Sequence, residues 1–244
     1  MTRVPGSPAR PESPARPATL GSPRLHLRVT DSTNTRAREL AAAGAPAGML
    51  VTAAQQTAGR GRQGRSWSAP PGRALLCSLI VAGTPPLLSL AAGVAVAEVA
   101  GPGAQLKWPN DVVRDGRKLA GILTEGRPQE AWAVLGIGIN VALRASDFPP
   151  ELRQTAGTLG LEPAAIEPTL TALLGALERW LFADASEVLE AVRARDVLLD
   201  RTVRWTDGEG VGAGIDDEGR LLVRTAAGRE ALTAGEVHLA GGAS

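Results

Sequence analysis

The stretch that decides the fold is residues 106–123, which read LKWPNDVVRDGRKLAGIL. The Asp-Gly pair at 115–116 separates two β-prone runs by two residues, a strong short-range signal for a β-hairpin. Pro109 fixes a turn after the preceding strand, so that the backbone leaves the sheet at Asn110 and Asp111. This stretch therefore predicts antiparallel strands that carry polar side chains at an edge of the sheet.

The strand after the turn carries a candidate site. Lys118 lies just past the turn, where its side chain can project from the sheet; the alternative is a solvent-exposed lysine beside a turn. Gly121 inside an apolar strand implies the close approach of a ligand or of another backbone. Simple alternation places Lys118, Ala120 and Ile122 on one face of this strand and Leu119, Gly121 and Leu123 on the other.

A second hairpin is predicted between residues 118–125 and 132–141. Alternation along the later strand places Gly136, Gly138 and Asn140 on one face. That face is bare enough for a flat ligand such as a purine, to which Asn140 offers both a donor and an acceptor. Two glycines that accommodate a packed helix are the alternative explanation.

The remaining pattern divides the chain into three parts. Prolines recur through residues 1–22, which predicts a disordered leader and no helix-turn-helix. Residues 23–198 mix strands with helices, the latter near residues 34–43, 87–100 and 170–192. From residue 199 to 244 short strands are broken by Asp-Gly, Glu-Gly and single Gly turns, which predicts a small β-barrel beside the larger domain.

Composition excludes several classes of protein. The 244 residues carry 26 basic against 25 acidic side chains, and this charge of +1 is unlike that of a nucleic-acid coat. A single cysteine excludes an intrachain disulfide framework and a multi-cysteine zinc site. No apolar run reaches the roughly 18 residues of a membrane span, and no apolar signal core begins the sequence. We therefore expect a cytoplasmic protein with no membrane partner.

Residues 57–67, TAGRGRQGRSW, form a segment that we call the Arg-Gly loop. No acid occurs between Glu39 and Glu98, so the arginines make this part of the chain positive. Glycine frees the backbone to approach a ligand, and arginine donates in pairs to phosphate or carboxylate. The loop is therefore expected to fold over an anion; an RNA-binding segment and a solvated surface loop are the alternatives.

Other phosphate and catalytic motifs do not fit. The loop matches G-x-G-x-x-G, but a dinucleotide fingerprint opens a helix and has an acid about 20 residues later. Neither a P-loop nor a G-x-S-x-G elbow occurs in the sequence.

Together, residues 31–34, 55–67, 107–111, 117–123 and 136–140 resemble the biotin–protein ligases, in the form without an N-terminal DNA-binding domain. The resemblance implies an α+β fold: a class II aminoacyl-tRNA synthetase/biotin synthetase-like catalytic domain with a C-terminal SH3-like β-barrel. It also implies an enzyme that converts biotin and ATP to biotinyl-5′-adenylate and transfers biotin to a lysine of a biotin carboxyl carrier protein. A lipoate–protein ligase, or a non-catalytic nucleic-acid-binding protein that uses the Arg-Gly loop, is the alternative.

The same resemblance assigns roles to individual residues. The catalytic residues are Lys118, Arg60, Lys107 and Asp111. Biotin contacts are Ser32, Thr33, Asn34, Gln55, Arg60, Gly61, Arg62, Lys118 and Gly121. ATP or adenylate contacts are Arg62, Arg65, Trp67, Lys107 and Asn140. Asp111 is the expected Mg²⁺ ligand, or else it helps to deprotonate the attacking amine.

Two further expectations concern partners and the barrel. The resemblance implies the carrier protein or carrier domain of a biotin-dependent carboxylase as partner, and no DNA, and it is compatible with a homodimer. Ala240 stands where some members have an arginine that assists ATP binding, so the contribution of the barrel to the nucleotide site is open.

Overall fold

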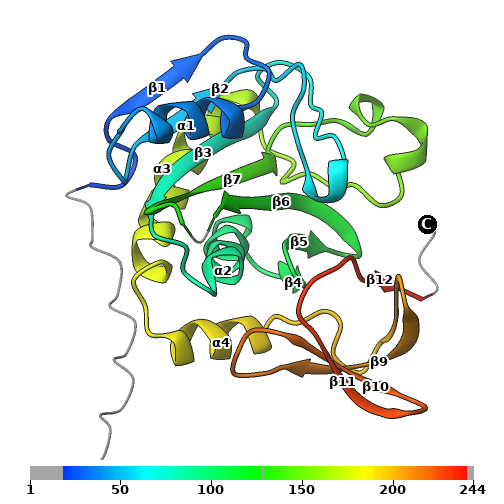
Figure 1. Ribbon diagram of the computed structural model, residues 1–244. Helices are drawn as coiled ribbons and strands as arrows, with labels where there is room; N and C mark the ends of the chain where they lie inside the picture. Colours follow the sequence, from blue (N-terminus) through cyan, green and yellow to red (C-terminus); the bar gives the residue numbers. More distant parts are fainter. Residues whose placement is uncertain (1–18, 128, 241–244) are drawn as a thin grey trace, which may run out of the picture.

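The computed structural model describes residues 19–127 and 129–240. A seven-stranded sheet forms the centre of the larger part, with the strand order β1-β2-β3-β7-β6-β5-β4 (Figure 1). Its strands are β1 (Arg24–Leu27), β2 (Leu50–Ala53), β3 (Ala74–Ala82), β4 (Gln105–Lys107), β5 (Asp111–Arg114), β6 (Arg117–Gly126) and β7 (Trp132–Asn140). Only the pair β1 and β2 is parallel among these strands. Both predicted hairpins, β5–β6 and β6–β7, are therefore confirmed.

Helices cover both faces of this sheet. They are α1 (Thr33–Ala42), α2 (Leu88–Ala100), α3 (Ile166–Trp180) and α4 (Ala185–Arg193), with short 3₁₀ turns η1 (Arg62–Gly64), η2 (Ala145–Asp147), η3 (Pro150–Leu152) and η4 (Pro163–Ala165). Of the helices in the described ranges, none is long and apolar enough to cross a bilayer. The first predicted helix begins at Thr33, one residue earlier than expected.

The two faces of β3 explain why this strand is apolar almost throughout. Leu79 and its alternate neighbours pack in the main core with α2, whereas Ile80 packs in a smaller cluster with α1. A strand that is buried on both faces reads as a continuous apolar run. Cys77 belongs to the main core, and its burial raises the pKa of the thiol to about 12.

Two small clusters lie at different ends of the α1 face of the sheet. Ala74 and Leu76 lie under Trp67, Leu143 and Phe148 near one end of β3. The α1 cluster covers the other end. Ser78 of β3 lies between Leu76 of one cluster and Ile80 of the other.

A β-bulge in the β5–β6 pair changes the predicted faces of β6. Val112 pairs with Ala120 but Val113 pairs with Lys118, so that one extra residue lies between them on β6. The expectation that Lys118 shares a face with Ala120 and Ile122 is therefore wrong. A Cβ on Gly121 would lie 3.3 Å from the Lys118 Nζ atom, whereas Ala120 packs in the main core. Such a bulge re-aims a side chain, and here it turns Lys118 toward Gly121.

The C-terminal part is a five-stranded antiparallel sheet, in agreement with the small β-barrel that was expected and with the α+β class. Its strands are β8 (Thr202–Trp205), β9 (Gly208–Ile215), β10 (Leu221–Thr225), β11 (Gly228–Leu232) and β12 (His238–Leu239), in the order β11-β10-β9-β8-β12. The Trp108 indole N–H donates to the Gly219 carbonyl at 2.9 Å and so attaches the C-terminal part to the larger part.

The leader prediction falls mostly outside the described residues, which begin at residue 19. Leu20 is buried, and the Gly21 N–H donates to the Gly48 carbonyl at 2.8 Å. Leu20 and Gly21 therefore pack with the larger part, and the expected boundary at residue 23 stays a prediction.

Candidate functional site

The register of the sheet brings two groups of functional residues together. Ser78 pairs with Gly136, which pairs with Leu123; we call these three residues the polar row. Lys107 pairs with Asp111, Asp111 with Gly121, and Gly121 with Gly138; these four residues form the charged row. Gly136 and Gly138 are two positions apart on β7, so the rows share a face and lie about 7 Å apart.

Asn34 fills the space above the polar row. A Cβ on Gly136 would lie only 2.0 Å from the Asn34 Oδ1 atom, so glycine is required for α1 to pack here. The Ser78 hydroxyl is fully buried and lies 2.6 Å from Asn34 Oδ1 and 2.8 Å from the Thr33 hydroxyl. Of the two explanations for the glycine face, packing of a helix holds at Gly136.

Ser32 and Thr33 lie beside the polar row, and we call this part of the site the polar end. These two residues are 2% and 4% exposed at the start of α1. The Thr33 N–H and hydroxyl both donate to Gln56 Oε1, at 2.7 and 3.0 Å. The glutamine that reaches this end of the site is thus Gln56, whereas Gln55 accepts the Thr30 N–H with its backbone carbonyl. Alternation could not choose between them, because β2 ends at Ala53.

Lys118, which follows the bulge, forms an ion pair with Asp111 of the charged row. The Lys118 ammonium lies 2.6 Å from Asp111 Oδ1 and 5.8 Å from the centroid of the Trp67 ring. Burial lowers the pKa of Lys107; nearby Asp111 partly offsets this effect and Lys118 adds to it. Burial also lowers the pKa of Arg62. Cations that have lost part of their hydration gain from an anionic ligand, so this row is suited to bind phosphate or carboxylate.

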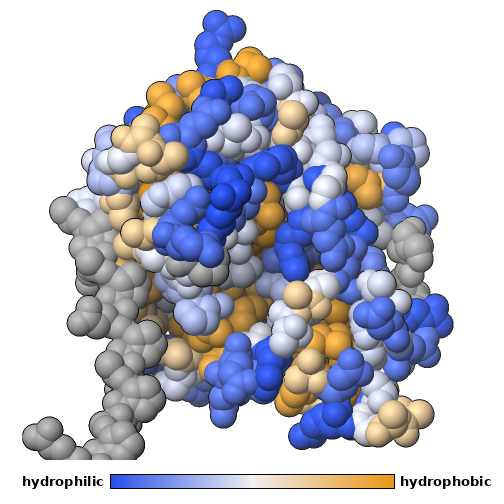
Figure 2. All heavy atoms as spheres, in the orientation of Figure 1, coloured by the Kyte–Doolittle hydropathy of each residue, from blue (hydrophilic) through white to orange (hydrophobic). Residues whose placement is uncertain are grey.

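The Arg-Gly loop closes on itself and then against three other elements. The Gly61 N–H donates to the Arg65 carbonyl at 2.7 Å, and the Trp67 N–H donates to the Gly59 carbonyl at 2.9 Å. A pocket of about 380 Å³ lies between the loop and Leu123 and Glu125 of β6. Hydrophilic residues gather over the middle of this face of the molecule (Figure 2).

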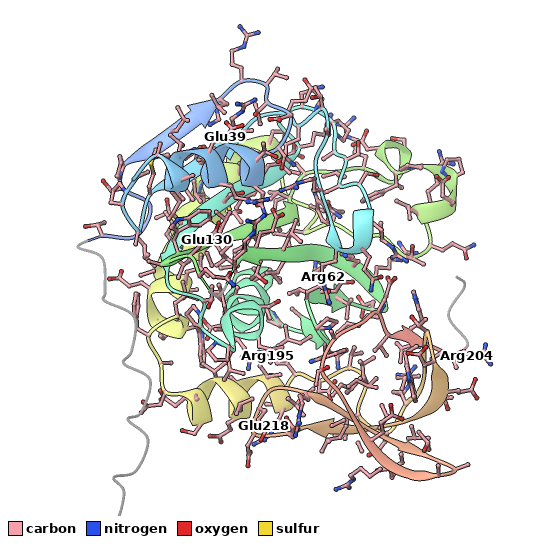
Figure 3. The ribbon with its side chains drawn as sticks, in the orientation of Figure 1. Glu39, Arg62, Glu130, Arg195, Arg204 and Glu218 are labelled. Carbon is pink, nitrogen blue, oxygen red and sulfur yellow. The ribbon has the colours of Figure 1, made fainter. Side chains whose placement is uncertain are left out.

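Each arginine of the loop has a partner from a different part of the chain. Arg60 Nη2 donates to Glu125 Oε2 at 2.5 Å. Arg62 lies beside β6, and its Nη1 donates to Asn110 Oδ1 at 3.1 Å (Figure 3). Arg65 forms an ion pair with Glu236, which precedes β12. The C-terminal sheet therefore contributes to the site through Glu236.

Trp67 lies against the glycines of the charged row. A Cβ on Gly138 would meet its indole ring at 2.6 Å, and one on Gly121 would meet it at 3.1 Å. Within the described residues the buried Trp67 Nε1 has no hydrogen-bond partner. Gly138 thus makes room for an aromatic side chain, and the proposed adenine contact of Trp67 stays a prediction.

Asn140 is buried at the end of β7. Its Nδ2 donates to the Gly157 carbonyl at 2.8 Å and so anchors the segment that follows β7. This bond occupies a donor that was expected to face a purine, and the contact of Asn140 with adenine likewise stays a prediction.

Asp111 fits the chemistry of a magnesium ion that arrives with ATP. In the described ranges no group of three or more His, Cys, Asp or Glu side chains could hold a metal. Mg²⁺ is commonly held by one or two carboxylates together with the phosphates of the substrate. Asp111 could supply one such oxygen, and the ion would neutralise phosphate charge; its role as a ligand stays a prediction.

The structure therefore gathers the predicted residues Ser32, Thr33, Asn34, Arg60, Gly61, Arg62, Lys107, Asp111, Lys118, Gly121 and Trp67 around the two rows. Arg65 reaches the same region from the C-terminal end of the loop. Sequence reasoning missed Ser78, Gln56, Glu125 and Glu236. A lone serine inside the apolar run of β3 was the one signal that could have identified Ser78.

Comparison with known proteins places this chain in a class of ligases. Residues 26–141 match the Biotin/lipoate A/B protein ligase family, and residues 190–239 match the Biotin protein ligase C terminal domain. The chain is 36% identical over 230 residues to the biotin--[acetyl-CoA-carboxylase] ligase of Mycobacterium tuberculosis, with 85% of each chain covered. It is 35% identical to the bifunctional ligase/repressor BirA of Bacillus subtilis, over 90% of this chain and 75% of BirA.

A solved structure agrees with the sequence comparison. The Aquifex aeolicus biotin protein ligase in complex with biotin and ATP has a TM-score of 0.79 and 26% identity, over 90% of this chain and 100% of that one. The chain belongs to the biotin protein ligase family.

Proposed function

We propose that the protein is an ATP-dependent ligase that activates biotin as biotinyl-5′-adenylate and transfers it to a lysine of a biotin carboxyl carrier protein. The observation that carries this proposal is the register that places the polar row beside the charged row on one face. An uncharged polar end suits the ureido ring of biotin, and a cationic end suits its carboxylate and the phosphates of ATP. Relatives named as biotin--[acetyl-CoA-carboxylase] ligases support the same substrate and a carboxylase carrier as partner.

The polar end also distinguishes biotin from lipoate. Ser32, Thr33 and Gln56 gather hydroxyl, N–H and amide groups that can bond the N–H and C=O groups of a ureido ring. The dithiolane ring of lipoate has no such groups, and filling this end with it would leave polar groups unpaired. A site built to hydrogen-bond its substrate strongly rejects an analogue that lacks the partner groups. Biotin is therefore the preferred acid.

Adenylation requires charge neutralisation rather than a base. The biotin carboxylate is already ionised at neutral pH. One of its oxygens attacks the α-phosphorus of ATP, the bond from that phosphorus to the β-phosphate bridging oxygen breaks, and pyrophosphate leaves. Lys118 lies where its ammonium can hold the carboxylate and an α-phosphate oxygen together. The Lys118 ammonium leaves its ion pair with Asp111 and pairs with these anions instead. It thereby stabilises the negative charge of the transition state.

The second step forms an amide. The neutral ε-amine of the carrier lysine attacks the acyl carbon, the bond from that carbon to the phosphate oxygen breaks, and AMP leaves. The amine loses one proton, which Asp111 can accept once Lys118 has turned to the phosphate. The adenylate is a reactive mixed anhydride, so the Arg-Gly loop protects it by excluding water.

The test is to incubate the protein with biotin, Mg-ATP and a biotin carrier domain and to detect the product with streptavidin. We expect carrier biotinylation that requires ATP and that lipoate does not replace. Absence of product would overturn the proposal, and a preference for lipoate would favour the related ligase. Salt-dependent oligonucleotide binding without biotin transfer would favour a nucleic-acid-binding protein.

A further inference from the structure

Glu125 joins the two parts of the site that would bind different substrates. Its Oε2 atom accepts from Asn34 Nδ2 at 2.8 Å and from Arg60 Nη2 at 2.5 Å. Its Oε1 atom lies 3.6 Å from Arg38 Nη1. One carboxylate on β6 thus holds α1 on one side and the Arg-Gly loop on the other.

The Asn34 side chain is fixed from both of its ends. The Ser78 hydroxyl donates to Asn34 Oδ1 at 2.6 Å. Asn34 Nδ2 donates to Glu125 and also faces the Leu123 carbonyl at 3.3 Å. Asn34 is 4% exposed, and its amide already bonds protein groups. Its side chain therefore moves with α1 and has few hydrogen-bonding groups left for a ligand.

Arg60 contrasts with Asn34 because it lies on the exposed loop. Its side chain is 39% exposed, whereas that of Glu125 is 21% exposed. A charge-assisted bond to a carboxylate that is itself fixed by a buried amide has a defined direction. The contact therefore transfers the orientation of the buried residues to the loop.

From this chain of contacts we propose that Glu125 is a positioning residue that couples occupancy of the polar end to closure of the Arg-Gly loop. The inference rests on the proposed function, because biotin is the ligand that would occupy that end. A ligand that holds Ser32, Thr33 and Gln56 in place also holds Asn34, and thereby Glu125 and Arg60. The closed loop then presents Arg62 and Arg65 to the phosphates of ATP.

The test measures this coupling as a binding cycle. The affinity for a non-hydrolysable ATP analogue is determined by calorimetry with and without saturating biotin, in the wild type and in Glu125→Gln. In the wild type we expect biotin to tighten analogue binding by roughly 5- to 150-fold, the usual range of coupling between sites. In Glu125→Gln this factor should fall below about twofold, while biotin alone still binds.

A matched control and a second variant complete the design. Glu39→Gln removes a different carboxylate that pairs with an arginine of α1, on the outer side of that helix (Figure 3), and should keep the full coupling. Arg60→Gln breaks the same contact from the exposed loop, so the test survives if Glu125→Gln does not fold. The double variant should lose no more coupling than either single variant.

The outcomes separate this inference from the proposed function. Full coupling in both Glu125→Gln and Arg60→Gln, in a protein that biotinylates its carrier, would overturn the role of Glu125 alone. Absence of coupling in an active wild type would overturn it as well. A wild type that neither binds biotin nor modifies a carrier would overturn both.

Discussion

The polar row and the charged row lie side by side on one face of the sheet, yet they are built in opposite ways. Around the polar row the hydrogen-bonding groups are buried and bonded to one another, as in the contacts of Ser78 with Thr33 and Asn34. Around the charged row the cations are partly exposed and paired with single carboxylates, as in Lys118 with Asp111. The first arrangement holds the polar groups in a fixed geometry. In the second, an anionic ligand can replace the carboxylate that pairs with each cation.

The largest effect should follow from removing the cation that pairs with Asp111 of the charged row. Lys118→Ala removes the donor that holds the two reacting anions, so adenylate formation in single turnovers should fall by roughly 10²–10³-fold. The neighbouring Arg117→Ala, at the exposed first position of β6, is the control and should change the rate little. A fall of less than about threefold, far below the usual loss for one such donor, would remove Lys118 from this role.

An intermediate effect should follow from disturbing the polar row. Ser78→Ala leaves Asn34 without its buried donor, and unpaired buried groups cost about 1–3 kcal/mol. Biotin affinity should therefore weaken by roughly tenfold, with unchanged affinity for ATP, both measured by calorimetry. Thr52→Ala removes a buried hydroxyl that bonds Arg24 instead, and should leave biotin binding intact. Equal losses of affinity in the two variants would mean that Ser78 acts only through general stability.

The smallest effect concerns Lys107 and pH. Its pKa is lowered by burial, so its charge is lost as the pH rises through a range in which an ordinary lysine stays charged. Loss of one screened charge interaction costs about 1 kcal/mol of binding free energy. The KM for ATP should therefore rise by roughly fivefold. Lys107→Arg keeps its charge throughout and should abolish this rise. Identical KM profiles for both proteins between pH 7 and pH 10 would contradict the prediction.

The hairpins and the gathering of most site residues could be predicted, because they depend on local signals. The Asp-Gly turn defines the β5–β6 pair, and apolar runs define β3 and β7. The bulge beside Leu119 could not be predicted, since it depends on how β5 fits against β6. It reversed the expected face of Lys118 relative to Gly121.

The misses within the site have a similar cause. Gln56 rather than Gln55 meets Thr33 because the chain leaves the strand geometry after Ala53, where alternation no longer applies. Glu125 and Glu236 meet their arginines across long separations in sequence, and nothing in the local pattern marks either contact. Contacts of this kind follow from tertiary packing alone.

The ion pair between Arg65 and Glu236 also bears on how the protein is made. The ribosome completes the Arg-Gly loop and the whole catalytic sheet before it adds the carboxylate that anchors Arg65. The C-terminal strands also share the main core with the larger sheet, through Val203, Leu221 and Val223. Synthesis of the last residues therefore supplies both the anchor of Arg65 and the rest of the core.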